Sequence, residues 1–156
     1  MKYFISVIAL LATVMATQMA QANFYLHPRA GLTISTGGDS RYTLGMTGGY
    51  RWTPFLSTEL SYARLFGNSS SPDGDLIEAD VRVGFPLGPL HGFASGGVGT
   101  IHTVLPGEDL WKNFIDFGTG LGFSLGPLGL SAGVTYAIVI DGEDFVGPYL
   151  SAGLSF

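Results

Sequence analysis

Apolar and polar residues alternate with a period of two through most of this chain. In the run 76–85, Ile77 and Val81 lie on one face of an extended segment, whereas Glu78 and Arg82 lie on the other. Two further runs alternate in the same way, 55–66 and 128–140. This period is typical of β-strands with one apolar face, and helical spacing is hard to find after residue 22. The pattern therefore predicts an all-β protein.

Turn signals divide the chain into segments of similar length. Tight turns are predicted at Thr53-Pro54, at Pro86-Leu87-Gly88-Pro89 and at Gly126-Pro127. Longer polar connections alternate with them, at 36–40, 67–74, 105–111 and 141–144. The segments between them predict eight strands, at 24–36, 40–52, 55–66, 75–86, 89–104, 112–126, 128–140 and 145–156. Their lengths bracket the roughly 9–11 residues with which a tilted strand crosses a bilayer.

The polar face distinguishes between two kinds of eight-stranded barrel. A soluble barrel such as a lipocalin has its apolar face inside and needs a solvated surface with roughly 25–35% charged residues. In this chain 12% of residues are charged, Gly accounts for 24 residues, and the polar face is mainly Gly, Ser and Thr. Small side chains suit the narrow interior of eight strands. We therefore expect an eight-stranded antiparallel up-and-down transmembrane β-barrel whose apolar face contacts lipid.

The first 22 residues have the features of an export signal. Lys2 precedes an apolar run over 4–15, and Ala20-Gln21-Ala22 matches the small-x-small cleavage pattern. A retained membrane anchor is the alternative, but the apolar run is too short to span a bilayer stably. We expect cleavage after Ala22, which leaves residues 23–156 as one outer-membrane β-barrel domain.

The lengths of the connections predict the orientation. Outer-membrane barrels have short periplasmic turns and longer external loops, so the three tight turns and both termini are expected in the periplasm. Aromatic residues fit two interfacial girdles, although each ring could instead simply pack against its neighbours. The expected girdles are Trp52, Phe55, Phe85 and Phe156 on the periplasmic side, and Tyr42, Tyr62, Phe66 and Trp111 on the outer side.

Three places fit the alternation poorly. Pro28 and Pro148 fall inside predicted strands, where each removes a donor from the hydrogen-bond ladder. At each we expect a bulge, a late strand start or a local break. The fifth strand is rich in Gly, and either His91 or His102 faces lipid unless a bulge switches its faces.

The inward phase predicts a balanced set of charges in the lumen. Four are basic and four acidic: Arg29, Arg41, Arg51, Glu59, Glu78, Asp80, Arg82 and Asp116. Charges in a narrow, partly dry interior are unfavourable unless paired, and the planar fork of Arg suits carboxylates. We expect Arg51 and Arg82 to bridge the carboxylates of the third and fourth strands, with Arg29 and Asp116 extending a network that plugs the lumen. Separate hydration in a water column is the alternative. Arg64 and Lys112 are expected near the outer rim.

Composition and spacing exclude several chemistries. The chain has no Cys, which rules out disulfides, thiol catalysis and Cys-based metal sites, and its net charge of −5 argues against nucleic acid. The histidines offer no Ser-His-acid set at a common height. The acidic connections lack the spacing of a calcium loop, and the Gly-x-Gly repeats at 118–122 are not followed by a helix. We therefore expect no catalytic residues, no metal site and no cofactor.

The last strand adds a more specific pattern. Leu150, Ala152, Leu154 and Phe156 alternate on the outward face and end the sequence on an aromatic residue. Together with the export signal and the eight alternating strands, this pattern resembles the small eight-stranded outer-membrane β-barrel family that includes the OmpA transmembrane domain and OmpX. The resemblance covers the whole chain after residue 22. It implies that these four residues form the signal presented to the outer-membrane assembly machinery.

The resemblance implies a location but does not define one activity, because the family is functionally diverse. We expect a monomeric outer-membrane protein with a structural or surface-interaction role, in contact with outer-membrane lipids and lipopolysaccharide. A small pore or transporter for small solutes is the first alternative. A lipid A-modifying enzyme is the second, although the chain matches the patterns of neither the deacylases nor the palmitoyltransferases.

Overall fold

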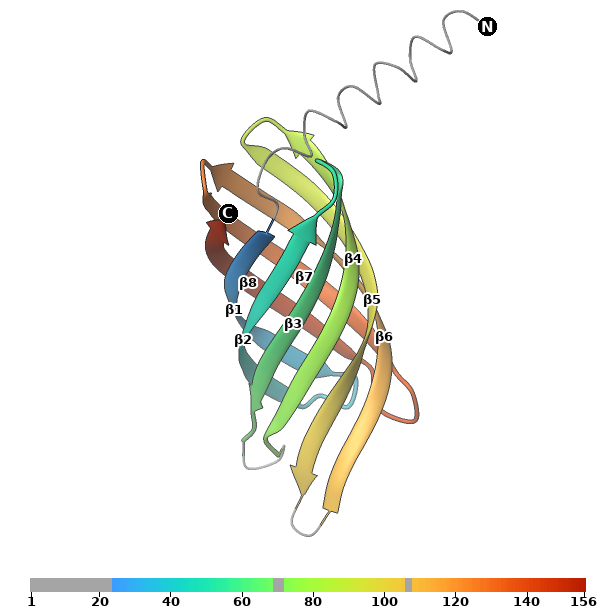
Figure 1. The fold of residues 1–156 in the computed structure, drawn as a ribbon. Helices are drawn as coiled ribbons and strands as arrows, with labels where there is room; N and C mark the ends of the chain where they lie inside the picture. The colour runs from blue at the N-terminus through green and yellow to red at the C-terminus, as the bar shows by residue number, and fades with distance from the viewer. Residues whose placement is uncertain (1–23, 69–71, 106–107) are drawn as a thin grey trace, which may run out of the picture.

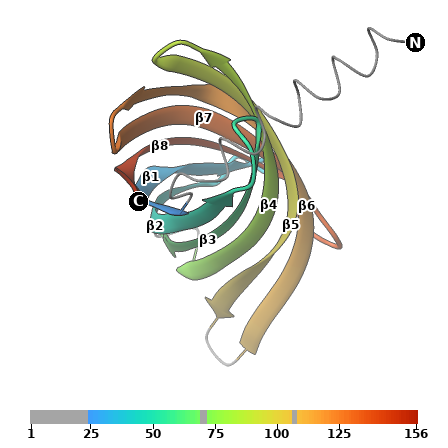
Figure 2. The same ribbon diagram turned by 45° about the horizontal axis from the view of Figure 1, so that its top comes forward.

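The computed structural model of the chain describes residues 24–68, 72–105 and 108–156, so the predicted export signal with its cleavage site lies outside the described residues. The eight strands are β1 (Phe24–Ser35), β2 (Ser40–Arg51), β3 (Leu56–Phe66), β4 (Gly74–Leu87), β5 (Leu90–Leu105), β6 (Glu108–Leu125), β7 (Leu128–Val139) and β8 (Phe145–Ser155). Each strand pairs antiparallel with its neighbours in sequence, and β1 pairs with β8 to close the barrel (Figures 1 and 2). None of the described residues forms a helix long and apolar enough to cross a membrane.

The two ends of the barrel differ in their connections. One end, which we call the terminal end, holds the start of β1 and the end of β8, together with the short turns 52–55, 88–89 and 126–127 (Figure 1). At the opposite, loop end lie the ends of β1, β3, β5 and β7 and the starts of β2, β4, β6 and β8. Gly88 and Gly126 have positive φ angles of 74° and 60°. Tight two-residue hairpins require a left-handed residue, which explains why glycine followed by proline predicted these two turns.

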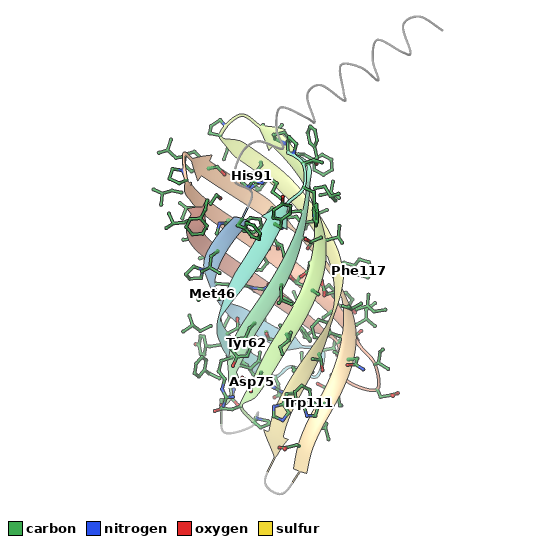
Figure 3. The ribbon with its side chains drawn as sticks, viewed as in Figure 1. Met46, Tyr62, Asp75, His91, Trp111 and Phe117 are labelled. Atoms are coloured by element: carbon green, nitrogen blue, oxygen red, sulfur yellow. The ribbon has the colours of Figure 1, made fainter. Side chains whose placement is uncertain are left out.

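Side chains alternate between the lumen and the outer surface along the strands. In β3, Leu60 is 61% exposed, whereas the neighbouring Glu59 and Ser61 are 7% and 2% exposed. Met46 and Phe117, which are labelled in Figure 3, belong to the exposed apolar set. An apolar exterior around an interior that holds charged residues is the reverse of the distribution in water-soluble proteins. The predicted fold class is confirmed.

The β5–β6 hairpin is longer than the sequence pattern indicated. β5 has 16 residues and β6 has 18, and their pairing continues to Leu105 opposite Glu108. At the loop end these two strands reach beyond the others (Figure 1). The predicted polar connection at 105–111 is therefore wrong, because most of that segment is paired strand. Polarity indicated exposure to solvent there, but a protruding hairpin is also exposed on its faces.

Both prolines interrupt the seam between β1 and β8. Paired positions on β1 are Tyr25 and Leu26, then 29–31, then 34–35, with gaps at 27–28 and 32–33. Pro28 lies in the first gap, and the second faces Pro148 in the same register. Each proline remains paired on its other side, with β2 or β7. The register is the same before and after each gap, so the outcome is a local break rather than a bulge.

Candidate functional site

The candidate site is the barrel interior, which the strand pleat and the cross-strand register build together. Inward positions on adjacent strands align in rows that run from strand to strand along the inner wall of the barrel. One such row joins Glu59 on β3 to Asp80 on β4, then Gly97 on β5 and Asp116 on β6. Residues distant in sequence are therefore brought side by side on the inner wall of the barrel.

Two buried ion pairs lie in this interior. Arg29 pairs with Glu78, and Arg82 Nη2 lies 2.9 Å from Glu59 Oε2. Both glutamate side chains are 4% exposed, and the two arginine side chains are 15% and 16% exposed. Tyr25 donates a hydrogen bond from its hydroxyl group to Glu59. Charge-assisted hydrogen bonds of this kind compensate for the loss of water around buried charges.

Aromatic rings hold the two arginines in place. The Arg29 guanidinium lies 4.2 Å from the ring centre of Tyr149, and the Arg82 guanidinium lies 4.1 Å from that of Phe93. Arg82 Nη2 also donates to the Tyr149 hydroxyl at 3.3 Å. The stacking adds an electrostatic attraction between each cation and a ring face. We call Tyr25, Arg29, Glu59, Glu78, Arg82, Phe93 and Tyr149 the charged layer.

Three carboxylates meet at one edge of this layer, one of them from the layer itself. Glu78, Asp80 and Asp116 each place an oxygen atom within 4.8 Å of the others. Asp116 is 1% exposed, and both of its carboxylate oxygens are buried without a hydrogen-bond partner. Among the described residues, neither Asp80 nor Asp116 forms an ion pair with a basic side chain. The sequence analysis placed these three residues in one network of lumen charges, but it expected arginines to bridge the carboxylates.

Arg41 and Arg51 lie at opposite ends of the lumen. Arg51 lines a cavity of about 280 Å³ at the terminal end, and its guanidinium lies 5.9 Å from the ring centre of Tyr25. Arg41 lines a cavity of about 330 Å³ at the loop end, together with Lys112. The bridge expected from Arg51 is made by Arg29 instead. The inward phase identifies which residues face the lumen, but strand tilt decides which of them share a height.

A second, apolar layer fills the lumen toward the loop end. It consists of Leu65, Leu76, Phe114, Ala137, Val139 and Phe145, with Ile101 packed against it. Leu65 and Ala137 are 0% exposed, and the rings of Phe114 and Phe145 meet edge to face at 5.5 Å. We call this cluster the apolar layer. Sequence reasoning missed it, although large apolar residues at inward positions near the loop-side ends of several strands were the available signal.

The two layers lie between the two cavities. The cavity at the terminal end reaches Tyr25 and Arg82 of the charged layer. The cavity at the loop end reaches Ile101, Val139 and Phe145 of the apolar layer. The linings of these cavities share no residue. Paired charges and packed apolar groups therefore lie in the lumen between the two cavities.

The histidines separate into inner and outer groups. His27 and His91 line the cavity at the terminal end, whereas His102 lies on the outer face of β5 near the loop end. His102 stacks on Trp111, with ring centres 4.3 Å apart. Pairing through β5 is continuous, so the ambiguous strand has no bulge. Figure 3 shows His91 near the terminal end and Trp111 near the loop end.

The outer rim near His102 carries a small polar cluster. Arg64 Nη1 lies 2.9 Å from Asp75, and the Tyr62 hydroxyl donates to the same carboxylate at 2.7 Å. Asp73 lies 3.5 Å from Arg64 Nη2. This arrangement places Arg64 at the rim, as expected. Tyr62 and Trp111 are 50% and 61% exposed beside the cluster, an arrangement typical of aromatic residues at a lipid–water boundary.

The remaining outward predictions concern the aromatic residues and the last strand. All eight girdle residues are 44–73% exposed: Tyr42, Trp52, Phe55, Tyr62, Phe66, Phe85, Trp111 and Phe156. On β8, Leu150 and Leu154 are 66% and 44% exposed, and Ala152 shares their face. The expected assembly signal thus forms one outward stripe that continues to Phe156.

Comparison with solved structures defines the class of fold. The N-terminal β-barrel domain of Pseudomonas aeruginosa OprF superposes with a TM-score of 0.67 at 17% identity, over 87% of this chain and 100% of that one. Neisserial surface protein A gives a TM-score of 0.61 at 23% identity, over 85% and 97%. Ail, the attachment invasion locus protein of Yersinia pestis, gives 0.52 at 20% identity, over 86% and 97%. The chain thus has the fold of the small eight-stranded barrels. No model of a protein family and no curated protein sequence matches it.

Proposed function

We propose that this chain is an integral outer-membrane β-barrel with a closed lumen and a structural or surface-interaction role. The observation that carries the proposal is the reversed distribution of side chains. Leu121 and Leu150 on the outside are 66% exposed, whereas Glu78 and Asp116 inside are 3% and 1% exposed. A surface of this kind is stable against hydrocarbon and unstable in water.

Closure of the barrel supports insertion into a bilayer. β1 pairs with β8, so the sheet has no free edge, and an unsatisfied backbone group in hydrocarbon costs several kcal/mol. The two aromatic girdles fit the two membrane boundaries. We assign the terminal end, with both termini, to the periplasm and the loop end to the cell exterior, because outer-membrane barrels keep their short turns in the periplasm.

The interior supports a non-catalytic, non-conducting role. A closed lumen is supported by the charged layer and the apolar layer, which lie between two cavities whose linings have no residue in common. A lipid A deacylase of the Ser-His-acid type needs its histidine on the outer surface beside a serine. His102 is on that surface, but the partners it faces are Trp111, Asp75 and Asp109. The proposed contacts are outer-membrane lipids and lipopolysaccharide, with the protein acting as a monomer.

Membrane insertion is tested by heat-dependent electrophoresis of the full chain expressed in a Gram-negative host. A closed barrel resists SDS until it is heated, so the unheated and boiled samples should migrate differently, and the protein should fractionate with the outer membrane. Recovery from the soluble periplasmic fraction, or a far-UV spectrum dominated by helix, would contradict the proposal.

Assembly is tested by removing Phe156. We infer that the outward stripe on β8 is presented to the outer-membrane assembly machinery, so the truncated chain should be exported and cleaved but should reach the outer membrane in reduced amount. A matched control is Phe85→Ala, which removes an equally exposed girdle ring from another strand. Wild-type assembly without Phe156 would show that this residue only contacts lipid.

A further inference from the structure

The interior charges do not balance where they are buried. Arg29 neutralises Glu78 and Arg82 neutralises Glu59, which leaves Asp80 and Asp116 without a basic partner among the described residues. The other inward basic groups, Arg41, Arg51 and Lys112, line the cavities at the two ends of the lumen. Carboxylates this close together in a confined interior are stabilised either by a shared proton or by a compensating positive charge.

The strand between the two aspartates carries no side chain at the position that faces them. Gly97 lies between Asp80 and Asp116 in the row that crosses β4, β5 and β6. A Cβ atom at this position would meet the backbone carbonyl oxygen of Ala79 and would lie 2.7 Å from Asp80 Oδ1, so a larger residue would press on both the β4 backbone and the carboxylate. Because position 97 is glycine, no side chain separates Asp80 from Asp116.

We propose that Glu78, Asp80 and Asp116 bind one divalent metal cation, with Ca²⁺ as the fitting chemistry. Calcium takes carboxylate and water oxygens at about 2.3–2.6 Å, so ligands on opposite sides of the ion lie about 5 Å apart. The three carboxylates meet this requirement, because their oxygens lie within 4.8 Å of one another. Asp116 supplies an independent sign of a ligand, since both of its buried oxygens have no hydrogen-bond partner.

The bound cation joins β4 to β6 across β5 and completes the charge balance of the lumen. Calcium suits this site better than magnesium, because magnesium demands near-ideal octahedral geometry and gives up its water reluctantly. The inference goes beyond the proposed function, and its test is independent of whether the lumen conducts. It is also a departure from the sequence analysis, which expected no metal site.

The test uses the full mature chain refolded in zwitterionic detergent without lipopolysaccharide, which itself binds divalent ions. Equilibrium dialysis against ⁴⁵Ca²⁺ measures binding, and heat-dependent gel migration measures the unfolding temperature with calcium or with chelator. We expect about one calcium ion per wild-type chain, and an unfolding temperature that rises with calcium concentration once the dissociation constant is exceeded. Because the site is enclosed, calcium is added both during refolding and afterwards.

The variants separate this site from other acidic groups. Asp116→Asn and Asp80→Asn should lose calcium binding, whereas the control Asp75→Asn, at the outer rim, should keep it. In chelator, Asp116→Asn should be at least as stable as wild type, because it removes a repulsive charge. Should neither amide variant fold, Asp80→Glu tests the site with all charges retained and should bind calcium more weakly, because it moves one ligand oxygen. Absence of binding to wild type, or unchanged binding by folded Asp116→Asn or Asp80→Glu, would overturn the proposal.

Discussion

The charged layer and the apolar layer occupy the same lumen but are held together by different physics. In the charged layer, Arg82 and Glu59 are held by ion pairs, hydrogen bonds and aromatic rings. In the apolar layer, Leu65 and Phe114 are held by packing alone, at 0% and 1% exposure. Packing depends on volume, whereas buried charges depend on each partner being present. The two layers should therefore respond differently to loss of one side chain and to replacement of a whole pair.

The largest effect is expected from breaking one buried ion pair. Arg82→Ala leaves Glu59 buried without its cation, which should lower the free energy of unfolding by about 3–5 kcal/mol. Urea unfolding of the refolded barrel, followed by Trp fluorescence, measures the change. Arg41→Ala is the matched control, because Arg41 forms no ion pair among the described side chains. Similar effects of the two substitutions would show that the interior charges are separately hydrated.

A somewhat smaller effect is expected in the apolar layer. Leu65→Ala removes a fully buried side chain and leaves a cavity, which should cost about 3 kcal/mol. The matched control is Leu60→Ala, which removes the same atoms from the outer face of β3, where lipid or detergent fills the space. The same unfolding titration measures both. A loss at position 60 as large as that at position 65 would argue against tight packing in the lumen.

Replacing a whole ion pair should cost less than breaking it. The double variant Arg82→Met with Glu59→Leu removes both charges together, so no unpaired charge is left, and it should be clearly more stable than Arg82→Ala. Tyr25 then loses the acceptor of its hydroxyl group, which limits the recovery. Comparison of the urea midpoints decides the point. A double variant no more stable than Arg82→Ala would mean that the unpaired charge of Glu59 is not the source of the loss in Arg82→Ala.

These contrasts also show what the sequence could and could not predict. Alternation identified the inward phase of β3 and β4, because a period of two follows directly from the pleat. It could not identify which inward residues share a height, since that depends on strand tilt and register, so Arg29 rather than Arg51 pairs with Glu78. The apolar layer was not predicted, because the inward face was expected to be polar, whereas inward residues such as Phe114 are apolar.

Ambiguities within single strands were resolved by the neighbouring strands. His91 and His102 have opposite phases on β5, and only the unbroken pairing with β4 and β6 shows that His91 faces inward. The polar segment at 105–111 had the composition of a loop, but pairing between β5 and β6 extends the strands through most of it. Composition indicated exposure in that segment and carried no information about pairing.

The smallest effect is expected at the outer rim. Arg64→Ala removes an ion pair with Asp75 in which the arginine side chain is 39% exposed, and exposed pairs contribute little because water screens them. Its urea midpoint should be indistinguishable from that of wild type. A loss approaching that of Arg82→Ala would show that the rim cluster is as shielded as the charged layer.

Planar-bilayer recording of the wild-type barrel tests the closed lumen most directly. The charged and apolar layers separate the two cavities, so we predict no steady open conductance and at most small, rare openings. Leu65→Ala with Arg82→Ala in one chain should conduct more often than wild type, because both layers are then weakened. A steady, large conductance from the wild-type protein would contradict the closed lumen and favour a pore.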